Sequence, residues 1–253
     1  MIGHIAAREL RSLFLSPLAW SILAVVLFIL AFMFLSQLDL YVGYQAQLAM
    51  MDSAPGVTEA VVTPLFSSAT IVLLLVSPLI TMRLISEERR NRTLPLLFSA
   101  PISMTEIVLG KYLGILGFFA IMLGLVVLMP LSLLLAGHLD FGLLISGLLG
   151  LILMIAAFAA AGLFMSTLTN HPTVAAVATF GLLLLLWVID WAGGMAGEGS
   201  GSGAVFSYLS LQKHYQSLLS GLFDSSDVVY YLLFIVTFLV LSIRRLDADR
   251  LQH

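Results

Sequence analysis

The sequence predicts an all-α integral membrane protein with six transmembrane helices, and three observations support this fold class. Of its 253 residues, 60% are hydrophobic and only 10% are charged, whereas soluble domains are about 25% charged. Six apolar stretches have the length that a bilayer core requires, about 20 residues each. Most Lys and Arg residues fall in the segments on one side of those stretches, as expected when a chain crosses a membrane repeatedly.

The six stretches form one transmembrane domain over residues 1–253. The first begins after Ser16, and Pro17 suits the first turn of a helix. Only residues 137–140 separate the third stretch from the fourth, and only residues 169–171 separate the fourth from the fifth. These short connections force antiparallel hairpins. The predicted spans are residues 17–38, 62–84, 112–136, 141–168, 172–191 and 228–243.

Basic residues predict the orientation, because Lys and Arg are enriched in cytoplasmic loops. Six spans place ten basic residues on one side and Lys213 alone on the other. We therefore expect both termini, and the loop between the second and third spans, on the cytoplasmic side of a bacterial inner membrane. The ten residues are Arg8, Arg11, Arg83, Arg89, Arg90, Arg92, Lys111, Arg244, Arg245 and Arg250.

Small residues are plentiful in the middle spans and just before them, several at a spacing of four, which lets helix backbones approach closely. They are Gly110, Gly114, Gly117, Gly124, Ser146, Gly147, Gly150, Ala157 and Ala161. We interpret them as packing sites within the subunit, with a dedicated dimer face as the alternative.

The spans contain almost no ionisable side chains near the bilayer centre. A proton- or ion-coupled pump needs carboxylates or histidines there, so the driving energy is expected to come from elsewhere. The chain has no cysteine, which excludes disulfides and thiolate chemistry. Its histidines lie in loops or at the ends and show no metal-ligand spacing. No enzyme activity, metal or cofactor is therefore expected on this chain.

An ATP-binding motif is also absent from the sequence. The only Gly-Lys pair, Gly110 and Lys111, lacks the upstream glycine and the following Ser or Thr of a phosphate-binding loop. ATP hydrolysis is therefore not expected on this chain.

The first of three informative segments outside the spans is the N-terminal residues 2–15. Apolar residues gather on one side at helical spacing, and Arg8 and Arg11 lie elsewhere. This pattern predicts a short helix along the cytoplasmic membrane surface. An ordinary basic flank is the alternative.

The second segment, residues 85–111, is too polar to span and too patterned for a disordered loop. Glu88 and Arg92 are spaced to support a short helix, and Ser103 with Glu106 resembles a capping box that starts the next helix. Pro95 and Pro101 break the chain between them, and Leu94, Leu96, Leu97 and Phe98 form an expected exposed apolar edge. Such an element docks in a groove of a soluble partner, although a solvated loop is the alternative.

The third segment, residues 192–227, lies on the outer side. Residues 193–203 have the composition of a flexible linker. The stripe that follows predicts an amphipathic helix, either on the outer membrane surface or dipping back between spans. Its members are Leu211, Tyr215, Leu218, Leu219 and Leu222.

The segment after the second span resembles the permease subunits of type-2 ABC exporters. The resemblance rests on Glu87 and Glu88, Thr93-Leu94 with Leu97, Pro101 with Ser103, and Gly110-Lys111. Arg92 departs from the family pattern, which commonly has Gly there, and so does Pro95. Residues 213–230 are in addition similar to the gliding-motility-type (GldF-like) permeases.

The resemblance implies a half-transporter that couples a separate ATPase to export or to mechanical work. Two six-helix subunits, identical or different, would form the path, and two copies of a cytoplasmic ABC ATPase would bind ATP and Mg. Partners would also include membrane lipid and a GldG-like membrane protein with a large extracytoplasmic domain, but no nucleic acid. The implied coupling residues are Glu87, Glu88, Arg89, Arg90, Arg92, Thr93, Leu94 and Leu97.

Two other functions stay open at this stage. Eleven methionines suit a permease linked to copper-site assembly (NosY-like), although methionine in apolar spans usually serves as packing material. A membrane scaffold without transport is the other possibility, and association with an ATPase would distinguish it.

Overall fold

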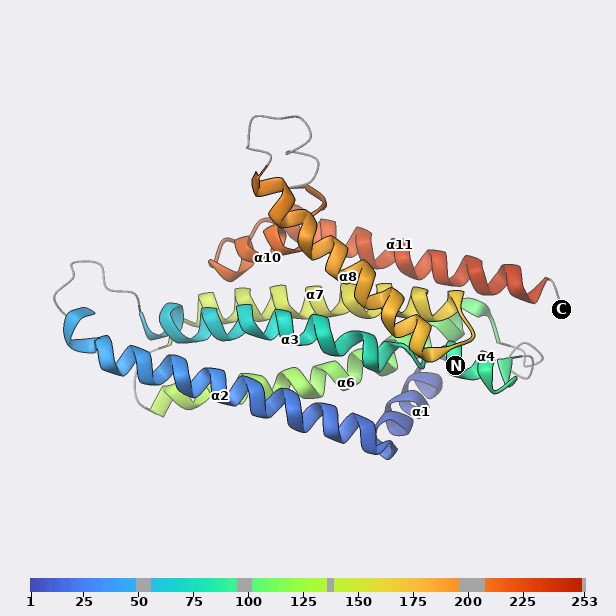
Figure 1. Ribbon diagram of the computed structural model, residues 1–253, viewed down its shortest axis with the longest axis horizontal. Helices are drawn as coiled ribbons and strands as arrows, with labels where there is room; N and C mark the ends of the chain where they lie inside the picture. Colours follow the sequence, from blue (N-terminus) through green and yellow to red (C-terminus); the bar gives the residue numbers. More distant parts are fainter. Residues whose placement is uncertain (49–55, 95–101, 136–138, 196–207, 252–253) are drawn as a thin grey trace.

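The computed structural model describes residues 1–48, 56–94, 102–135, 139–195 and 208–251 (Figure 1). Within these ranges every regular element is a helix, as predicted. Six helices are long and apolar enough to cross a membrane: Pro17–Gln45, Thr58–Arg90, Met104–Leu135, Phe141–Leu168, Pro172–Ile189 and Ser225–Arg250. The predicted number of spans is therefore confirmed.

The helices extend beyond the predicted spans because the chain stays helical after its apolar stretch ends. Helix α2 covers Pro17–Leu48 and α11 covers Ser225–Arg250. A π-helix, η1 (Thr58–Val62), leads into α3 (Thr63–Thr81), and a short turn then leads to α4 (Ser86–Arg90). The fourth and fifth spans are α7 (Phe141–Leu168) and α8 (Pro172–Met195).

Helix caps fix where two of these spans begin. Helix α6 (Met104–Ser132, followed by the 3-10 turn Leu133–Leu135) starts with the predicted capping box. The Ser103 hydroxyl accepts the Glu106 N–H at 3.2 Å, and the Glu106 carboxylate accepts the Ser103 N–H at 3.1 Å. Asp224 caps α11 by accepting the Ser226 N–H at 2.9 Å, and this backbone hydrogen bond lowers the pKa of the Asp224 carboxyl.

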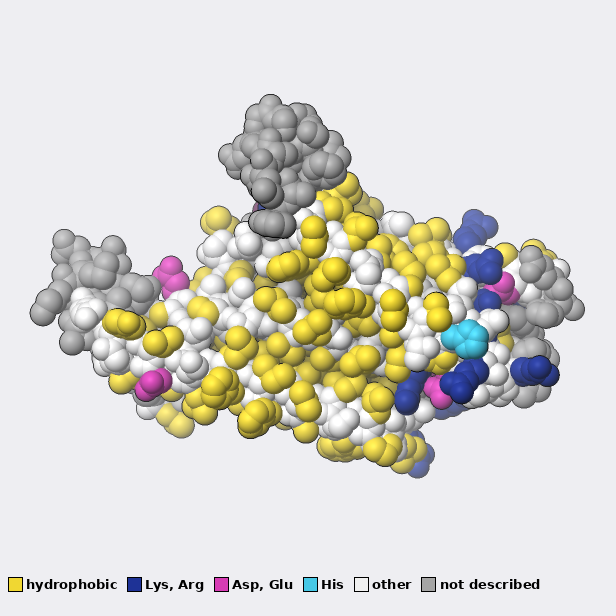
Figure 2. Space-filling view, viewed as in Figure 1, with side chains coloured by type: hydrophobic (Ala, Val, Ile, Leu, Met, Phe, Trp, Pro, Cys, Tyr) yellow, Lys and Arg dark blue, Asp and Glu magenta, His cyan; other side chains and the backbone are white. Residues whose placement is uncertain are grey.

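Charge separates the two ends of the molecule. Lys and Arg side chains gather at one end (Figure 2), which carries both chain termini and α4 (Figure 1). We call this the basic end. Both termini lie at one end because an even number of long helices runs back and forth between the two ends.

Helix α7 lies at the centre of the bundle, in contact with α3, α6, α8, α10 and α11. Small residues let its neighbours approach. A Cβ built at Gly150 would lie 3.0 Å from Leu218 and Tyr215 side-chain atoms, and one built at Gly147 would lie 3.0 Å from Phe66. The glycines of the fourth span therefore pack within the subunit, as predicted.

The N-terminal helix α1 (Ile2–Leu15) packs across the start of α6. Its predicted apolar side makes this contact: the Phe14 and Phe118 rings lie 5.5 Å apart, and Leu10 lies over Gly117. Ser16 is extended (φ −84°, ψ 128°), which forms the elbow to α2. Arg8 and Arg11 stay exposed, as expected for residues on the far side of an amphipathic helix.

Glycine is required where α1 crosses α6. A Cβ built at Gly110 would lie 2.6 Å from the Ile5 Cβ, and one at Gly114 would lie 2.7 Å from the Glu9 Cβ. Gly110→Ala is expected to destabilise the subunit by about 1–3 kcal/mol through overpacking and to expose α1 to protease. Gly124→Ala is the matched control, because no atom of the described residues lies within 4 Å of a Cβ built there. Equal melting temperatures for the two variants would contradict this packing.

Helix α10 (Leu211–Leu219) buries four members of its predicted stripe, namely Leu211, Tyr215, Leu218 and Leu219. They lie against α7, α8 and α11, so the predicted apolar stripe packs against the long helices of the bundle. The prediction also included Leu222, and that was wrong: Leu222 is 68% exposed. The helix ends at Leu219, and Gly221 then adopts φ 80°, a left-handed conformation that turns the chain away.

Polar contacts anchor α10 to its neighbours. The Ser146 hydroxyl donates to the Leu218 carbonyl at 2.7 Å, and the Tyr231 hydroxyl donates to the Leu211 carbonyl at 2.7 Å. His214 Nδ1 lies 2.6 Å from an Asp227 oxygen, and its ring stacks on Tyr230 at 4.1 Å. Helix α10 is therefore joined to both α7 and α11.

Candidate coupling site around helix α4

Helix α4 is the short helix that follows α3 and closes the second membrane-crossing segment at the basic end. A turn over residues 82–85 separates it from α3. Acidic Glu87 and Glu88 stand in its first turn and basic Arg89 and Arg90 in its last, the arrangement that complements the helix dipole. The sequence therefore forms a helix here, as predicted for the coupling segment.

The two sides of α4 differ in exposure. Glu87, Arg90, Arg92 and Thr93 are exposed, whereas Glu88 and Arg89 are half-buried against the other helices. Leu94 is only 7% exposed, so the prediction that it forms part of an exposed apolar edge was wrong. Leu97, also predicted as a coupling residue, lies outside the described residues, as do Leu96 and Phe98.

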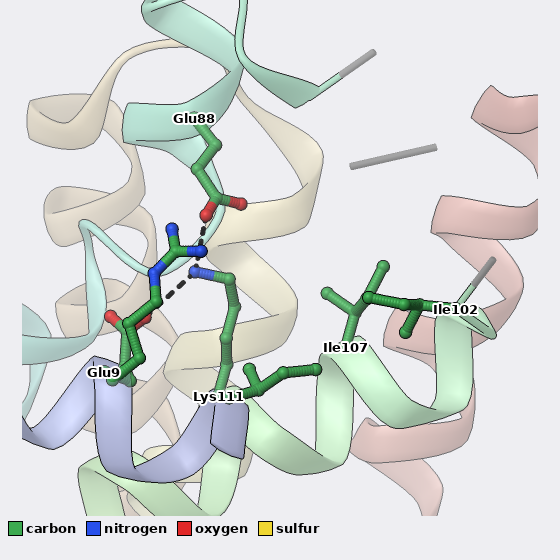
Figure 3. A pocket seen from close by; sticks show the side chains of 7 residues that line it. Glu9, Glu88, Ile102, Ile107 and Lys111 are labelled. Atoms are coloured by element: carbon green, nitrogen blue, oxygen red, sulfur yellow. Dashed lines mark hydrogen bonds and ion pairs between the residues drawn. The ribbon is translucent and has the colours of Figure 1, made fainter. Parts of the chain in front are cut away.

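Lys111 on α6 joins α4 to α1. Its ammonium lies 2.8 Å from a Glu88 oxygen and 3.1 Å from a Glu9 oxygen, and the residue is 4% exposed. Figure 3 shows the ammonium between the two carboxylates. The predicted helix-internal partner of Glu88 was Arg92, but the structure pairs Glu88 with Lys111 instead. The ammonium has three N–H donors and can therefore bond both carboxylates at once.

A small cavity of about 60 Å³ borders this cluster. Charged residues line one part of it and apolar side chains another (Figure 3). The second carboxylate oxygen of Glu88 is buried and has no hydrogen-bond partner among the described residues. The lining residues are Ile5, Arg8, Glu9, Glu88, Ile102, Ile107 and Lys111.

Arg89 joins α4 to the last span. Its guanidinium forms an ion pair with Asp249 near the end of α11. Arg245, one turn earlier on α11, lies 3.6 Å from the other Asp249 oxygen. The inward side of α4 is thereby attached to α1, α6 and α11, while its other side stays free of the bundle.

The end of α4 explains one departure from the family pattern. Arg92 has φ 55°, a left-handed conformation that favours glycine. The Arg92 N–H donates to the Arg89 carbonyl at 3.1 Å and the Thr93 N–H to the Glu88 carbonyl at 3.0 Å, which closes the helix end. The glycine common in the family suits this backbone, and Arg92 adopts it at a cost of about 1–2 kcal/mol.

The part of the chain that the structure describes contains no group of three or more His, Asp or Glu side chains placed to hold a metal ion. The charged side chains at the basic end instead form ion pairs, and backbone hydrogen bonds close the end of α4. Such contacts hold helices together and present charge to a partner.

The six long apolar helices define a multi-pass membrane protein. Ion pairs hold the short charged helix α4 against α6 and α11 at its basic end. The family model described as ABC-2 family transporter protein matches residues 4–251. The chain therefore belongs to the ABC-2 family of transporter proteins. A comparison with curated proteins finds no match.

Proposed function

We propose that this chain is the permease subunit of an ATP-binding cassette transporter and that the exposed side of α4 contacts a separate ATPase. The division of α4 into an exposed charged side and an anchored side is the observation that supports this proposal. Glu87, Arg90 and Arg92 are free to meet a soluble partner, while Glu88 and Arg89 attach the helix to the membrane bundle.

Movement of the ATPase would reach the spans through these attachments. Bound nucleotide favours one arrangement of the two ATPase subunits over another. A helix bound to these subunits would move when their arrangement changes. Helix α4 cannot move far without displacing Lys111 or Asp249, because both partners are largely buried. ATP and Mg would bind on the two partner ATPases, and a second permease subunit would complete the path.

Two finer assignments rest on the sequence. Residues 213–230 support the gliding-motility-type (GldF-like) subgroup, in which a GldG-like membrane protein would be a further partner. The work done would be export or mechanical transmission across the membrane.

We propose that the basic end faces the cytoplasm, and cysteine labelling tests this orientation. The chain has no native cysteine, so single replacements give a clean signal. Gln216 and Arg90 are both exposed and lie on α10 and α4. In intact cells, Gln216→Cys is expected to react with a membrane-impermeant maleimide, and Arg90→Cys only after lysis. The reverse pattern would overturn the orientation and, with it, the contact with a cytoplasmic ATPase.

A further inference from the structure

Ser166, near the end of α7, contacts both sides of the turn that leads into α4. Its hydroxyl oxygen accepts the N–H groups of Ile85 and Ser86, each at 3.0 Å. The same hydroxyl donates to the Met82 carbonyl at 3.1 Å. Ser166 is fully buried, with 0% of its surface exposed.

These contacts satisfy groups that the helices leave unpaired. The last carbonyls of α3 and the first N–H groups of α4 have no partner within their own helices. In a buried position, each unpaired group would cost about 1–3 kcal/mol. One hydroxyl from the fourth span therefore caps the start of α4 and, together with the Ser86 hydroxyl, the Met82 carbonyl at the end of α3.

Helix α7 also lies against α3 one turn earlier. Gly162 faces Thr81, and a Cβ at Gly162 would collide with the Thr81 side chain. Gly162 and Ser166 are four residues apart, so they lie on the same side of α7. This close approach brings Ser166 within reach of the turn.

The link through Ser166 is shorter and stiffer than the ion pairs of α4. Lys111 and Arg89 reach their partners through long side chains that can change rotamer as helices shift. The Ser166 hydroxyl stands one carbon from the backbone, so α7 must follow if the start of α4 moves. Helix α7 in turn contacts α3, α6, α8, α10 and α11.

We propose that Ser166 is the positioning residue through which displacement of α4 reaches α7 and hence the outer half of the subunit. This inference rests on the proposed function, since it assumes that an ATPase moves α4. Ser166 would thus transmit movement between helices, whereas the exposed side of α4 would bind the ATPase.

The test uses the complex with its ATPase, reconstituted in lipid nanodiscs. Spin labels at Val42→Cys on α2 and Ile145→Cys on α7, both exposed, measure the distance between these helices without nucleotide and after trapping with ATP and vanadate. Ser166→Ala is expected to leave ATPase binding intact and to reduce the nucleotide-driven distance change to less than half. Ser166→Thr keeps the hydroxyl, so this variant is expected to show the full nucleotide-driven distance change.

Ser242→Ala is the matched control, because Ser242 is also fully buried but donates only within its own helix, to the Phe238 carbonyl. It is expected to behave like the unmodified chain. A Ser166→Ala complex with the full distance change would overturn the proposal, and so would a distance that stays fixed in an unmodified complex that hydrolyses ATP.

Hydrogen exchange gives a readout that needs no variant. If Ser166 carries the link, the amides of Ile85 and Ser86 stay protected with and without trapped nucleotide. Loss of their protection on trapping would contradict the proposal. If the unmodified subunit binds no ATPase, the proposed function fails instead, so the two failures are distinguishable.

Discussion

Lys111→Met is expected to destabilise the subunit by about 3–5 kcal/mol, the usual cost of removing one partner from a buried ion pair. Two carboxylates lie within 3.1 Å of the Lys111 ammonium. Without it, Glu9 and Glu88 would face each other in a largely buried site and repel. Helix α1 should separate from α4, which thermal unfolding in detergent and proteolysis of the N-terminal helix would both detect.

A triple variant separates charge from packing at this site. Adding Glu9→Gln and Glu88→Gln to Lys111→Met removes the whole charge cluster, and replacing a complete buried ion group is often nearly neutral. Most of the lost stability should therefore return. A triple variant as unstable as Lys111→Met would show that the lysine side chain acts through packing and not through its charge.

Charge reversal on the exposed side of α4 is expected to release the ATPase. Glu87→Arg combined with Arg90→Glu should weaken binding by about 30-fold or more, corresponding to the loss of about 2 kcal/mol expected at an interface hot spot. Both residues are exposed, so the stability of the subunit itself should change by less than about 0.5 kcal/mol. Affinity between the purified subunits measures the first effect and thermal unfolding the second.

Arg244→Glu provides the control for this reversal. Arg244 is exposed on α11 near the same end of the molecule, so the variant changes charge there without touching α4. It should retain the ATPase. Equal loss of binding in both variants would mean that general charge at the basic end, and not α4, holds the partner.

Local patterns in the sequence predicted most of the architecture. The six spans follow from apolar length, and the start of α6 follows from Ser103 and Glu106, three residues apart. The buried stripe of α10 follows from helical spacing. The prediction was wrong for Leu222, the last residue of the stripe, because helical spacing alone does not show where a helix ends. Gly221 in the sequence does indicate that end.

The attachments of α4 could not be predicted in the same way, because they join residues far apart in the sequence. Arg89 and Asp249 are 160 positions apart. Lys111, the partner of Glu88, also pairs with Glu9, 102 positions away. Helical spacing offered Arg92 as the partner of Glu88, but the helix ends before a second turn forms and Arg92 adopts a left-handed conformation. Ser166 gave no sequence signal, since a serine near a helix end usually bonds within its own helix.

Photocrosslinking from position 90 of α4 in intact cells tests directly whether this helix meets an ATPase. A photoreactive amino acid at Arg90 is expected to capture a soluble protein with a nucleotide-binding domain, and mass spectrometry identifies it. The same probe at Gln216, on α10, should not capture that protein. Capture of the ATPase from Gln216, or from neither position in cells where the subunit is correctly inserted, would contradict the assignment of α4 as the contact.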